Sequence, residues 1–375
     1  MKRVSFFLAM LCVLLAFSCK KDNGSSDAPA PTPTPAPESP QLDNPANCYI
    51  VSTPGDYSFK AVKGNSDESV GTIASVVVLW ESFGTNVQPV VNSLIAKVGL
   101  TAGNPVIITF STPAILKNGN ALIAAKDASD HILWSWHIWL CSGYDAQACA
   151  QTYYNGAGVM MDRNLGATSA TPGDIEAYGL FYQWGRKDPF LGGCELNIST
   201  KEIERAASTC YWPDAVASDA SHGTIDYTIQ NPTTFIKATS DWLNTSNDNL
   251  WKTEKTMYDP CPPGWRVPDE EGKDEDKSIW LKAIGNKGKS ITFDENHYGV
   301  NFTGKFGDAA SIWYPATGYF VPSGIFDLFC EDAGWWSCSA SGSNAVCACI
   351  DDEMPSVFFS PSPRAFGQSV RCCKE

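Results

Sequence analysis

Apolar and polar residues alternate over short stretches in the first third of the chain, which predicts β-strands. In residues 132–140 (ILWSWHIWL) Trp134 and Trp136 share one face with Ile132, Ile138 and Leu140, whereas Ser135 and His137 share the other. His137 is therefore expected to be a strand residue with a hydrogen-bond partner rather than a catalyst. Further strands are predicted at residues 49–52, 57–62, 75–80, 106–110 and 121–125. Together they predict an all-β sandwich over residues 45–141.

The pattern changes after a polar connector at residues 142–157. Residues 158–375 are rich in Trp, Pro and Gly and show little helical periodicity. Short helices are predicted at residues 200–207, 233–239 and 277–284. An acidic run at residues 269–276 (DEEGKDED) lacks the spacing of an EF-hand, so we expect a solvated loop there.

The N-terminus has the pattern of a bacterial export signal. Lys2 and Arg3 precede an apolar run at residues 6–17, which is shorter than the roughly 20 residues that span a bilayer. The junction LLAFSC that ends at Cys19 resembles a bacterial lipobox. This resemblance implies a signal peptide over residues 1–18 and a lipid anchor on Cys19. The alternative is an ordinary secreted protein that is cut near Ser18.

A proline-rich segment follows the lipobox. Residues 28–40 (APAPTPTPAPESP) alternate proline with small residues, and such a stretch stays solvated and extended because it has little apolar surface to bury. Residues 19–44 are therefore predicted to be a tether. With the lipid, the tether indicates an outer-membrane protein that faces the cell exterior.

The net charge and the number of cysteines exclude some of the functions that this chain could have. The formal net charge of −14 argues against a nucleic-acid partner. Cys12 lies in the signal and Cys19 at the lipobox, so twelve of the fourteen cysteines remain in the exported part. An even number of cysteines in an exported protein indicates disulfides. Zinc is the competing interpretation, but no C-x-x-C occurs, and we expect neither a metal nor a cofactor.

Six sequence blocks resemble one bacterial family in their order. They are VMMDRNLGA (159–167), GLFYQWG (179–185), DPCPPGWRVP (259–268), ATGYF (316–320), WWSCS (335–339) and GQSVRC (367–372). These blocks resemble the Fibrobacter succinogenes major paralogous domain, which is similar in fold to C-type lectin-like domains and formylglycine-generating enzymes. The resemblance implies an α+β fold in which the N-terminal sandwich is followed by a C-type lectin-like module over residues 158–375, with its first and last strands paired.

The resemblance also implies a disulfide between Cys261 and Cys372. Such a bridge would close a loop of about 110 residues and contribute roughly 3–5 kcal/mol. The partner of Cys373 is left open. Cys338 is a second candidate, with Cys347 or Cys349 as its partner, because residues 341–344 are expected to turn a hairpin between them.

The sequence lacks the motifs of the enzymes and lectins that share this fold. The Glu-Pro-Asn, Gln-Pro-Asp and Trp-Asn-Asp triplets of calcium-dependent lectins are absent, as are G-x-S-x-G, HExxH and P-loop motifs. We therefore expect no enzyme but a non-catalytic surface recognition module, an adhesin or a pilus-associated lipoprotein. A glycan-binding accessory lipoprotein of a polysaccharide-uptake system is the first alternative, and an enzyme of unrecognised type is the second.

Two loops are predicted to carry the recognition surface, at residues 319–336 and 341–363. They combine aromatic rings with carboxylates, which suits sugars because sugar rings stack apolar faces and donate hydroxyl hydrogen bonds. Phe320 and Phe326 flank a Pro-Ser-Gly turn and are expected to be exposed, whereas Trp335 and Trp336 are expected in the core. The predicted ligand-binding residues are Phe320, Phe326, Asp327, Asp351 and Asp352, with Asp332 nearby. The expected partner is a surface glycan, a protein ligand or pilus subunits.

Overall fold

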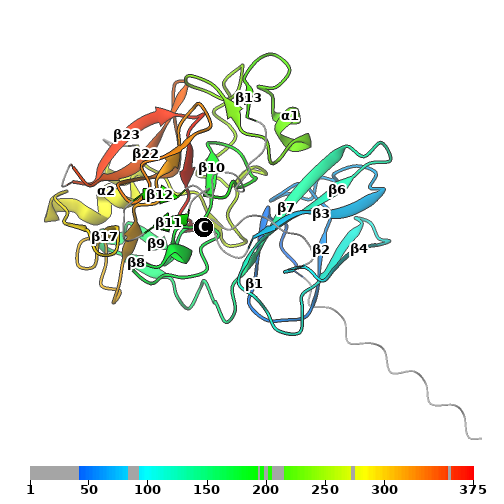
Figure 1. Cartoon of the computed structure of the whole chain (residues 1–375), viewed down its shortest axis with the longest axis horizontal. Helices are drawn as coiled ribbons and strands as arrows, with labels where there is room; N and C mark the ends of the chain where they lie inside the picture. Colours follow the sequence, from blue (N-terminus) through cyan, green and yellow to red (C-terminus); the bar gives the residue numbers. More distant parts are fainter. Residues whose placement is uncertain are drawn as a thin grey trace, which may run out of the picture. The chain divides into compact units, whose positions relative to one another are not determined.

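Strands dominate the computed structural model, which describes residues 42–82, 93–192, 195–197, 202–204, 215–271, 275–353 and 356–375 (Figure 1). Two sheets form the N-terminal part. The four-stranded sheet has the order β1-β7-β6-β3, and the three-stranded sheet has the order β2-β5-β4. Their strands are β1 Cys48–Val51, β2 Asp56–Lys60, β3 Ser75–Ser82, β4 Lys97–Thr101, β5 Ile107–Ser111, β6 Gly119–Lys126 and β7 Ile132–Leu140. The six predicted strands are confirmed, and β4 was not predicted.

A single core lies beneath both of these sheets. Tyr49 and Trp136 reach it from the first sheet, and Phe59 and Phe110 reach it from the second. Phe59 packs against Trp136 with ring centroids 5.3 Å apart. The pairing between β1 and β7 is parallel, so the strand that enters the fold runs alongside the strand that leaves this part.

The opposite face of β7 is buried as well. His137 is 1% exposed, and its Nε2 donates a hydrogen bond to Asn120 Oδ1 at 2.8 Å. Burial lowers the pKa of His137 to about 3, which keeps the ring neutral. The predicted structural role of this histidine is confirmed. Ser135 on the same face contacts a buried ion pair between Lys187 and Asp188, whose Nζ and Oδ1 are 2.8 Å apart.

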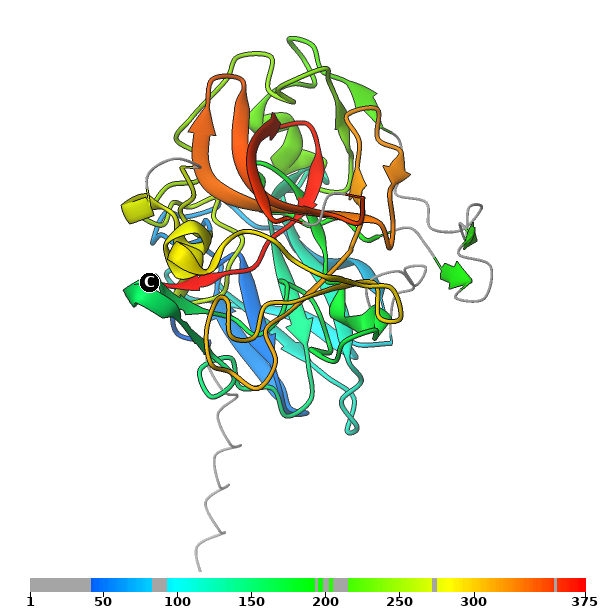
Figure 2. The same cartoon turned by 90° about the vertical axis from the view of Figure 1, so that its left-hand side faces the viewer.

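The largest sheet belongs to the C-terminal part and has the order β20-β19-β24-β21-β22-β23, with β10 paired to β24. Its strands are β10 Phe181–Gln183, β19 Tyr319–Phe320, β20 Phe326–Asp327, β21 Asp332–Ser341, β22 Asn344–Asp351, β23 Phe358–Pro363 and β24 Gly367–Ser369. The orange-to-red ribbons of these C-terminal strands lie next to one another (Figure 2). The predicted hairpin at residues 341–344 joins β21 to β22, with Gly342 at positive φ in the turn.

A second sheet, of order β15-β25-β9-β8, joins the beginning of the C-terminal part to its end. Met160 in β9 pairs with Cys373 in β25. The resemblance implies this pairing of first and last strands. The strands are β8 Gln151–Tyr153, β9 Gly158–Met160, β15 Trp265–Arg266 and β25 Cys373–Lys374.

Shorter elements fill the connections. The paired strands are β11 Glu195–Asn197 with β12 Glu202–Glu204, β13 Val216–Ala217 with β14 Ile236–Lys237, and β16 Phe293–Asp294, β17 Gly299–Asn301 and β18 Trp313–Pro315 in one sheet. The helices are α1 Ile225–Gln230 and α2 Ile279–Ile284, with single 3₁₀ turns at Tyr154–Gly156, Ile175–Ala177, Glu275–Lys277 and Gly285–Lys287.

One of the predicted helices is confirmed. Helix α2 lies within residues 277–284 and begins at Ser278, whose side chain accepts a hydrogen bond from Leu281 N. The helix predicted at residues 233–239 is wrong, because Ile236 there pairs with Val216 as β14. Residues 202–204 of the helix predicted at 200–207 form β12 instead, and its other residues lie outside the described residues.

The residues from Ser39 to Glu375 form one compact unit. Asn47, just before β1, donates hydrogen bonds to the carbonyl oxygens of Met257 and Asp259 at 2.7 and 2.8 Å. Its Oδ1 accepts one from Trp134 Nε1 at 3.1 Å. The N-terminal sheets are therefore joined to the C-terminal part by direct hydrogen bonds from Asn47, whose amide nitrogen and oxygen both have partners.

Candidate functional site

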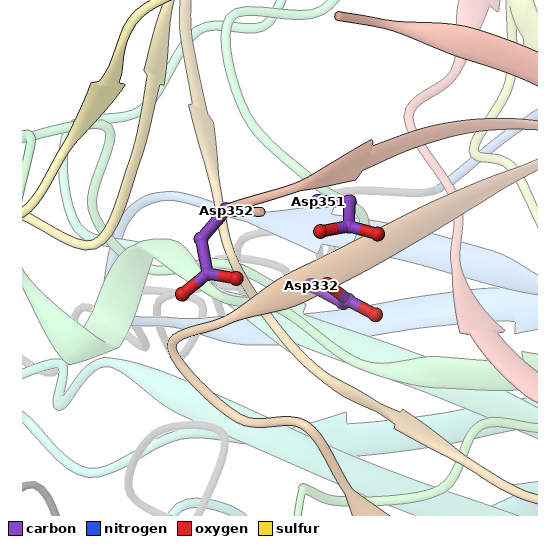
Figure 3. A group of neighbouring side chains, drawn as sticks. All are labelled: Asp332, Asp351 and Asp352. Atoms are coloured by element: carbon purple, nitrogen blue, oxygen red, sulfur yellow. The ribbon is translucent and has the colours of Figure 1, made fainter. Parts of the chain in front are cut away.

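Three aspartates meet where β21 begins and β22 ends. Asp332 lies directly opposite Asp351 in the antiparallel ladder, and Asp352 follows directly after the end of β22. Each offers a carboxylate oxygen, and these oxygens lie within 4.8 Å of one another. Figure 3 shows the three side chains grouped around the two strands. The site is built by strand register, since the hairpin brings together residues about twenty positions apart in sequence.

A phenol and a fourth carboxylate extend this group. Tyr319 in β19 donates a hydrogen bond to Asp332 Oδ2 at 3.4 Å. Asp327 in β20 is the partner of Tyr319 in the adjacent ladder. We refer to Tyr319, Asp327, Asp332, Asp351 and Asp352 as the acidic cluster. Asp327 and Asp352 are exposed, and the other three are partly buried.

The acidic cluster has unusual electrostatics. Partial burial raises the pKa of Asp332 to about 7, and the charges of Asp351 and Asp352 add to the effect. Burial also raises the pKa of Tyr319, with Asp332 as the next cause. The carboxylates can accept hydrogen bonds from hydroxyl groups, and Asp332 can donate one while protonated. The oxygens of Asp332, Asp351 and Asp352 are also ligands of the kind that Ca²⁺ takes.

The structure brings together part of the predicted ligand-binding set. Asp351 and Asp352 are adjacent to Asp332, and Asp327 joins them through Tyr319. Tyr319 was not predicted as a site residue, although the register of a β19–β20 hairpin would have placed it beside Asp327. No sequence motif marks it, because its role depends on the pairing of two separate hairpins.

The predicted exposure of Phe320 and Phe326 is wrong. Phe320 is 7% exposed and Phe326 is 6% exposed. Both rings pack edge-to-face on Phe181, with centroids 5.7 and 5.3 Å away. The Pro-Ser-Gly turn between the two residues favoured their exposure, but burying each ring is more favourable because it removes a large apolar area from water. Ile325 at the tip of the same hairpin is 49% exposed instead. Trp335 and Trp336 are buried, as predicted.

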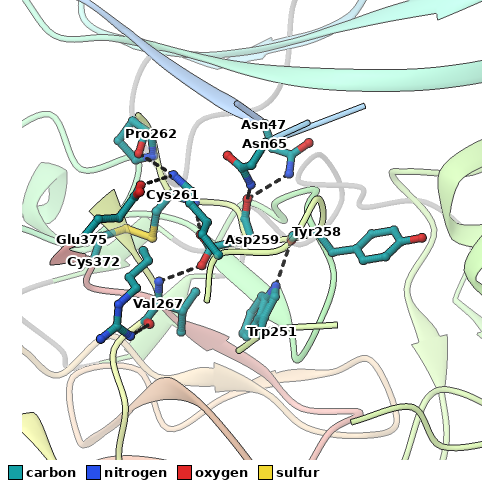
Figure 4. Close-up of a disulfide and its surroundings, with 12 residues drawn as sticks. Asn47, Asn65, Trp251, Tyr258, Asp259, Cys261, Pro262, Val267, Cys372 and Glu375 are labelled. Atoms are coloured by element: carbon teal, nitrogen blue, oxygen red, sulfur yellow. Dashed lines mark hydrogen bonds and ion pairs between the residues drawn. A yellow bond between two sulfur atoms is a disulfide. The ribbon is translucent and has the colours of Figure 1, made fainter. Parts of the chain in front are cut away.

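The disulfide between Cys261 and Cys372 is present and closes a sequence separation of 111 residues (Figure 4). The side chain of Asp259 stabilises the turn that contains Cys261. Its carboxylate accepts hydrogen bonds from Cys261 N and Val267 N, both at 2.9 Å. Burial raises the pKa of Asp259 to about 6, although the nearby charge of Lys255 opposes the rise. Cys373 is buried with a free thiol.

The other predicted cysteines divide into two groups. The thiol of Cys338 donates to Asp269 Oδ1 at 3.1 Å, whereas the sulfur atoms of Cys347 and Cys349 are 2.9 Å apart. The structure therefore brings Cys347 and Cys349 together and places Cys338 beside a carboxylate. Cys19, the predicted lipidation site, lies outside the described residues.

A cleft of about 630 Å³ lies beside Cys338. Its lining includes Asp248, Thr253, Glu254, Asp269 and Glu271. A volume of this size is within the range of small-ligand sites. Asp269 is already engaged, since Thr253 Oγ1 and Arg266 donate to it at 2.6 Å each. The carboxylates of Glu254 and Glu271 are exposed at the rim, and Glu271 accepts a hydrogen bond from Lys277 Nζ at 3.3 Å.

Comparison with known proteins finds no family model, curated protein or solved structure that matches this chain. Among the described residues there is no helix with the length and apolar character needed to cross a membrane.

Proposed function

We propose that this chain is a non-catalytic recognition module of the bacterial cell surface, an adhesin or a pilus-associated lipoprotein. In this proposal a lipid on Cys19 anchors the chain to the outer membrane, and the tether of residues 19–44 presents the folded part to the exterior. The folded part combines a β-sandwich over residues 45–141 with a C-type lectin-like module over residues 158–375. Support for the module comes from the six sequence blocks and from the pairing of β9 with β25.

The observation that carries the proposal is the acidic cluster. Its phenol and three of its carboxylates are held on β19, β20, β21 and β22, which belong to a single sheet, and Asp352 follows directly after β22. Groups fixed on strands lose little conformational entropy when a ligand binds. Charge repulsion between Asp332 and Asp351 works against folding. A cluster that is rigid, partly exposed and electrostatically unfavourable is better explained by a binding role than by a role in stability.

The chemistry of the cluster favours a ligand rich in hydroxyl or amide donors. Carboxylates accept such hydrogen bonds, and charged acceptors form stronger ones than neutral acceptors. A carbohydrate or the surface of a glycoprotein fits this description. A polyanion does not, since the formal net charge of the chain is −14.

The test is binding by a cluster variant and by a control variant of equal charge. Asp332→Asn with Asp351→Asn neutralises the centre of the acidic cluster, and Glu254→Gln with Glu271→Gln neutralises two residues of the cleft. Each purified protein is applied to a printed glycan array and to cultured host cells, in calcium and in EDTA. We expect the cluster variant to lose binding by tenfold or more, as from the loss of about 1.4 kcal/mol. Unchanged binding by the cluster variant would refute the proposed site.

The cleft favours one alternative function, a glycan-binding accessory lipoprotein of a polysaccharide-uptake system. Its volume of about 630 Å³ and its rim carboxylates suit a short oligosaccharide. The same experiment separates the two functions. Loss of glycan binding by the cleft variant alone would assign the ligand to the cleft, and host-cell binding would then be unaffected by either variant.

A further inference from the structure

Cys347 and Cys349 lie on one face of β22, which is next to the edge strand β23 of the largest sheet. They are two residues apart on a regular strand, so their side chains point the same way. Their sulfur atoms are 2.9 Å apart, which is about 0.9 Å longer than a disulfide bond. The register of β22 with both neighbours is continuous here, since Cys349 lies opposite Gly334 on one side and Phe358 on the other.

The two cysteines differ in their burial and in their polar contacts. Cys347 is fully buried, and its sulfur lies 3.2 Å from Ser362 Oγ and 3.4 Å from the carbonyl oxygen of Ser360. Cys349 is partly exposed. Gly334 lies opposite Cys349, and a Cβ added there would lie 2.3 Å from Gln368 Oε1. Cys349 is therefore the more exposed residue of the pair, although Gln368 packs beside this part of the strand.

We propose that Cys347 and Cys349 form a reversible disulfide, which opens and closes by exchange with low-molecular-weight thiols and disulfides, such as glutathione, at the sulfur of Cys349. Residues two apart on a strand have Cα atoms about 6.6 Å from one another, close to the upper limit of about 6.8 Å for disulfides. Closure must therefore strain the strand, and strained disulfides are the more easily reduced ones. The couple should open under milder conditions than Cys261–Cys372.

The exchange proceeds in two balanced steps. A glutathione thiolate attacks Cys349 Sγ, the bond between Cys347 and Cys349 breaks, and Cys347 leaves as a thiolate that takes up a proton. A second glutathione thiolate then attacks the mixed disulfide, which releases glutathione disulfide and the Cys349 thiolate, and that thiolate is protonated in turn. Two electrons pass from two glutathione molecules to the protein disulfide, and the reverse steps close it.

The charge distribution supports this direction of attack. In the reduced pair, a hydrogen bond from Cys349 is the main cause that lowers the pKa of Cys347, against the opposing effect of burial. Hydrogen bonds from Ser362 and Gln368 act in the same sense, and these two remain while Cys349 is held in the mixed disulfide. A thiol with a lowered pKa is the faster leaving group in exchange. The sulfur of Cys347 is thus suited to leave, and the sulfur of Cys349, the more exposed residue of the two, to be attacked.

The first test uses the wild-type full chain, equilibrated in glutathione buffers of graded redox ratio and then alkylated. Digestion before aspartate gives a peptide of residues 332–350, which contains Cys338, Cys347 and Cys349. In oxidised buffer we expect this peptide to lack two hydrogens, with alkylation only at Cys338 by fragmentation. The bond should open at a more oxidising ratio than Cys261–Cys372. Alkylation of both Cys347 and Cys349 in oxidised buffer, or a bond from Cys338 to either, would overturn the proposal.

The second test uses single variants to trap the intermediate. Cys347→Ser leaves the exposed sulfur without its partner, so we expect it to retain one glutathione as a mixed disulfide. Cys349→Ser leaves only the buried sulfur and should capture glutathione at least tenfold more slowly. Cys373→Ser, which changes another buried thiol, should keep the Cys347–Cys349 bond. Equal capture by the two single variants would contradict exchange at Cys349, and a folding failure of either variant leaves the wild-type measurement decisive.

Discussion

At the scale of single residues, Asp332 shows how a strand register creates an unfavourable charge. The antiparallel pairing places it opposite Asp351, and like charges in directly opposed positions repel. Burial first, and the charges of Asp351 and Asp352 next, make Asp332 hold its proton, so its folded-state pKa of about 7 lies above the ordinary value of 3.8. The folded chain therefore binds this proton more tightly than the unfolded chain does. The resulting stabilisation is complete below about pH 4 and is lost as the pH rises through 7.

Replacing Asp332 with asparagine should remove this pH dependence. Above pH 7 the variant is expected to be more stable than the wild type by about 1 kcal/mol, a value discounted because the side chain is only partly buried. This corresponds to a melting temperature about 2 °C higher. Near pH 4 the two proteins should melt together. Thermal unfolding at pH 4 and pH 8 measures the difference, with exposed Asp327→Asn as the control. A variant that is less stable at pH 8 would contradict the assigned repulsion.

Phe320 is expected to behave as a core residue. Phe320→Ala removes a ring that packs on Phe181, Phe235 and Phe326, so it should lower the free energy of unfolding by about 3–5 kcal/mol. Ile325→Ala on the same hairpin should change it by less than about 0.5 kcal/mol, because Ile325 is largely exposed. Chemical denaturation of the two variants provides the comparison. Equal stability of both would show that the Phe320 ring is not buried in solution.

At the scale of elements, the positions of the strands could be predicted from the sequence, but the tertiary contacts that the strands make could not. The alternation in residues 132–140 correctly predicts β7 and its tryptophan face. It could not reveal that Ser135 and His137 are also buried, because their partners Lys187, Asp188 and Asn120 come from distant segments. The helix predicted at residues 233–239 fails for the same reason, since the tertiary pairing with β13 overrides a weak local preference.

The contact between β1 and the turn before Cys261 should be sensitive to one side chain. Asn47→Ala deletes three buried hydrogen bonds, to Met257 O, to Asp259 O and from Trp134 Nε1. At about 1 kcal/mol for each bond, with a further penalty for buried groups left unpaired, the expected loss is about 3–5 kcal/mol. Asn44→Ala is the control, because Asn44 is exposed nearby. Denaturant unfolding should show a large shift of the midpoint for Asn47→Ala only.

At the scale of the whole molecule, a disulfide links segments that are far apart in the sequence. The resemblance alone located the disulfide, since twelve cysteines allow too many pairings for spacing to choose among them. The acidic cluster was predicted only in part. Asp351 and Asp352 are sequence neighbours, but Tyr319 and Asp332 join them through sheet topology. Topology depends on pairings between residues far apart, which local patterns do not encode.

Removing the disulfide should weaken the entire compact unit. Replacing both Cys261 and Cys372 with alanine frees a loop with a sequence separation of 111 residues, and the chain-entropy model gives a loss of about 4–5 kcal/mol. Cys373→Ala deletes a neighbouring buried thiol and should have a much smaller effect, about 1 kcal/mol. Calorimetry of the three proteins tests this order. Comparable losses in both variants would show that local packing, rather than the cross-link, provides the stability.

The membrane anchor has a direct test. Cys19→Ala removes the thiol that carries the lipid in the proposed arrangement, so the protein should move from the membrane fraction to the soluble exported fraction. Ser18→Ala keeps a small residue before the cysteine and should stay with the membrane. Fractionation and immunoblotting distinguish the two locations. Persistence of Cys19→Ala in the membrane pellet would exclude the lipid as the anchor.

The parallel pairing of β1 with β7 has a mechanical consequence. If the chain is tethered and binds its ligand as proposed above, a pull between the tether and the ligand enters at the start of β1 and leaves past the end of β7. The four residue pairs from Cys48–His137 to Val51–Leu140 then bear the load in shear, all at once, instead of unzipping one by one. The amide of Asn47 shares this load through its bonds to Met257 and Asp259. A protein that holds a cell against fluid flow would thereby resist extension at the point where the tension enters.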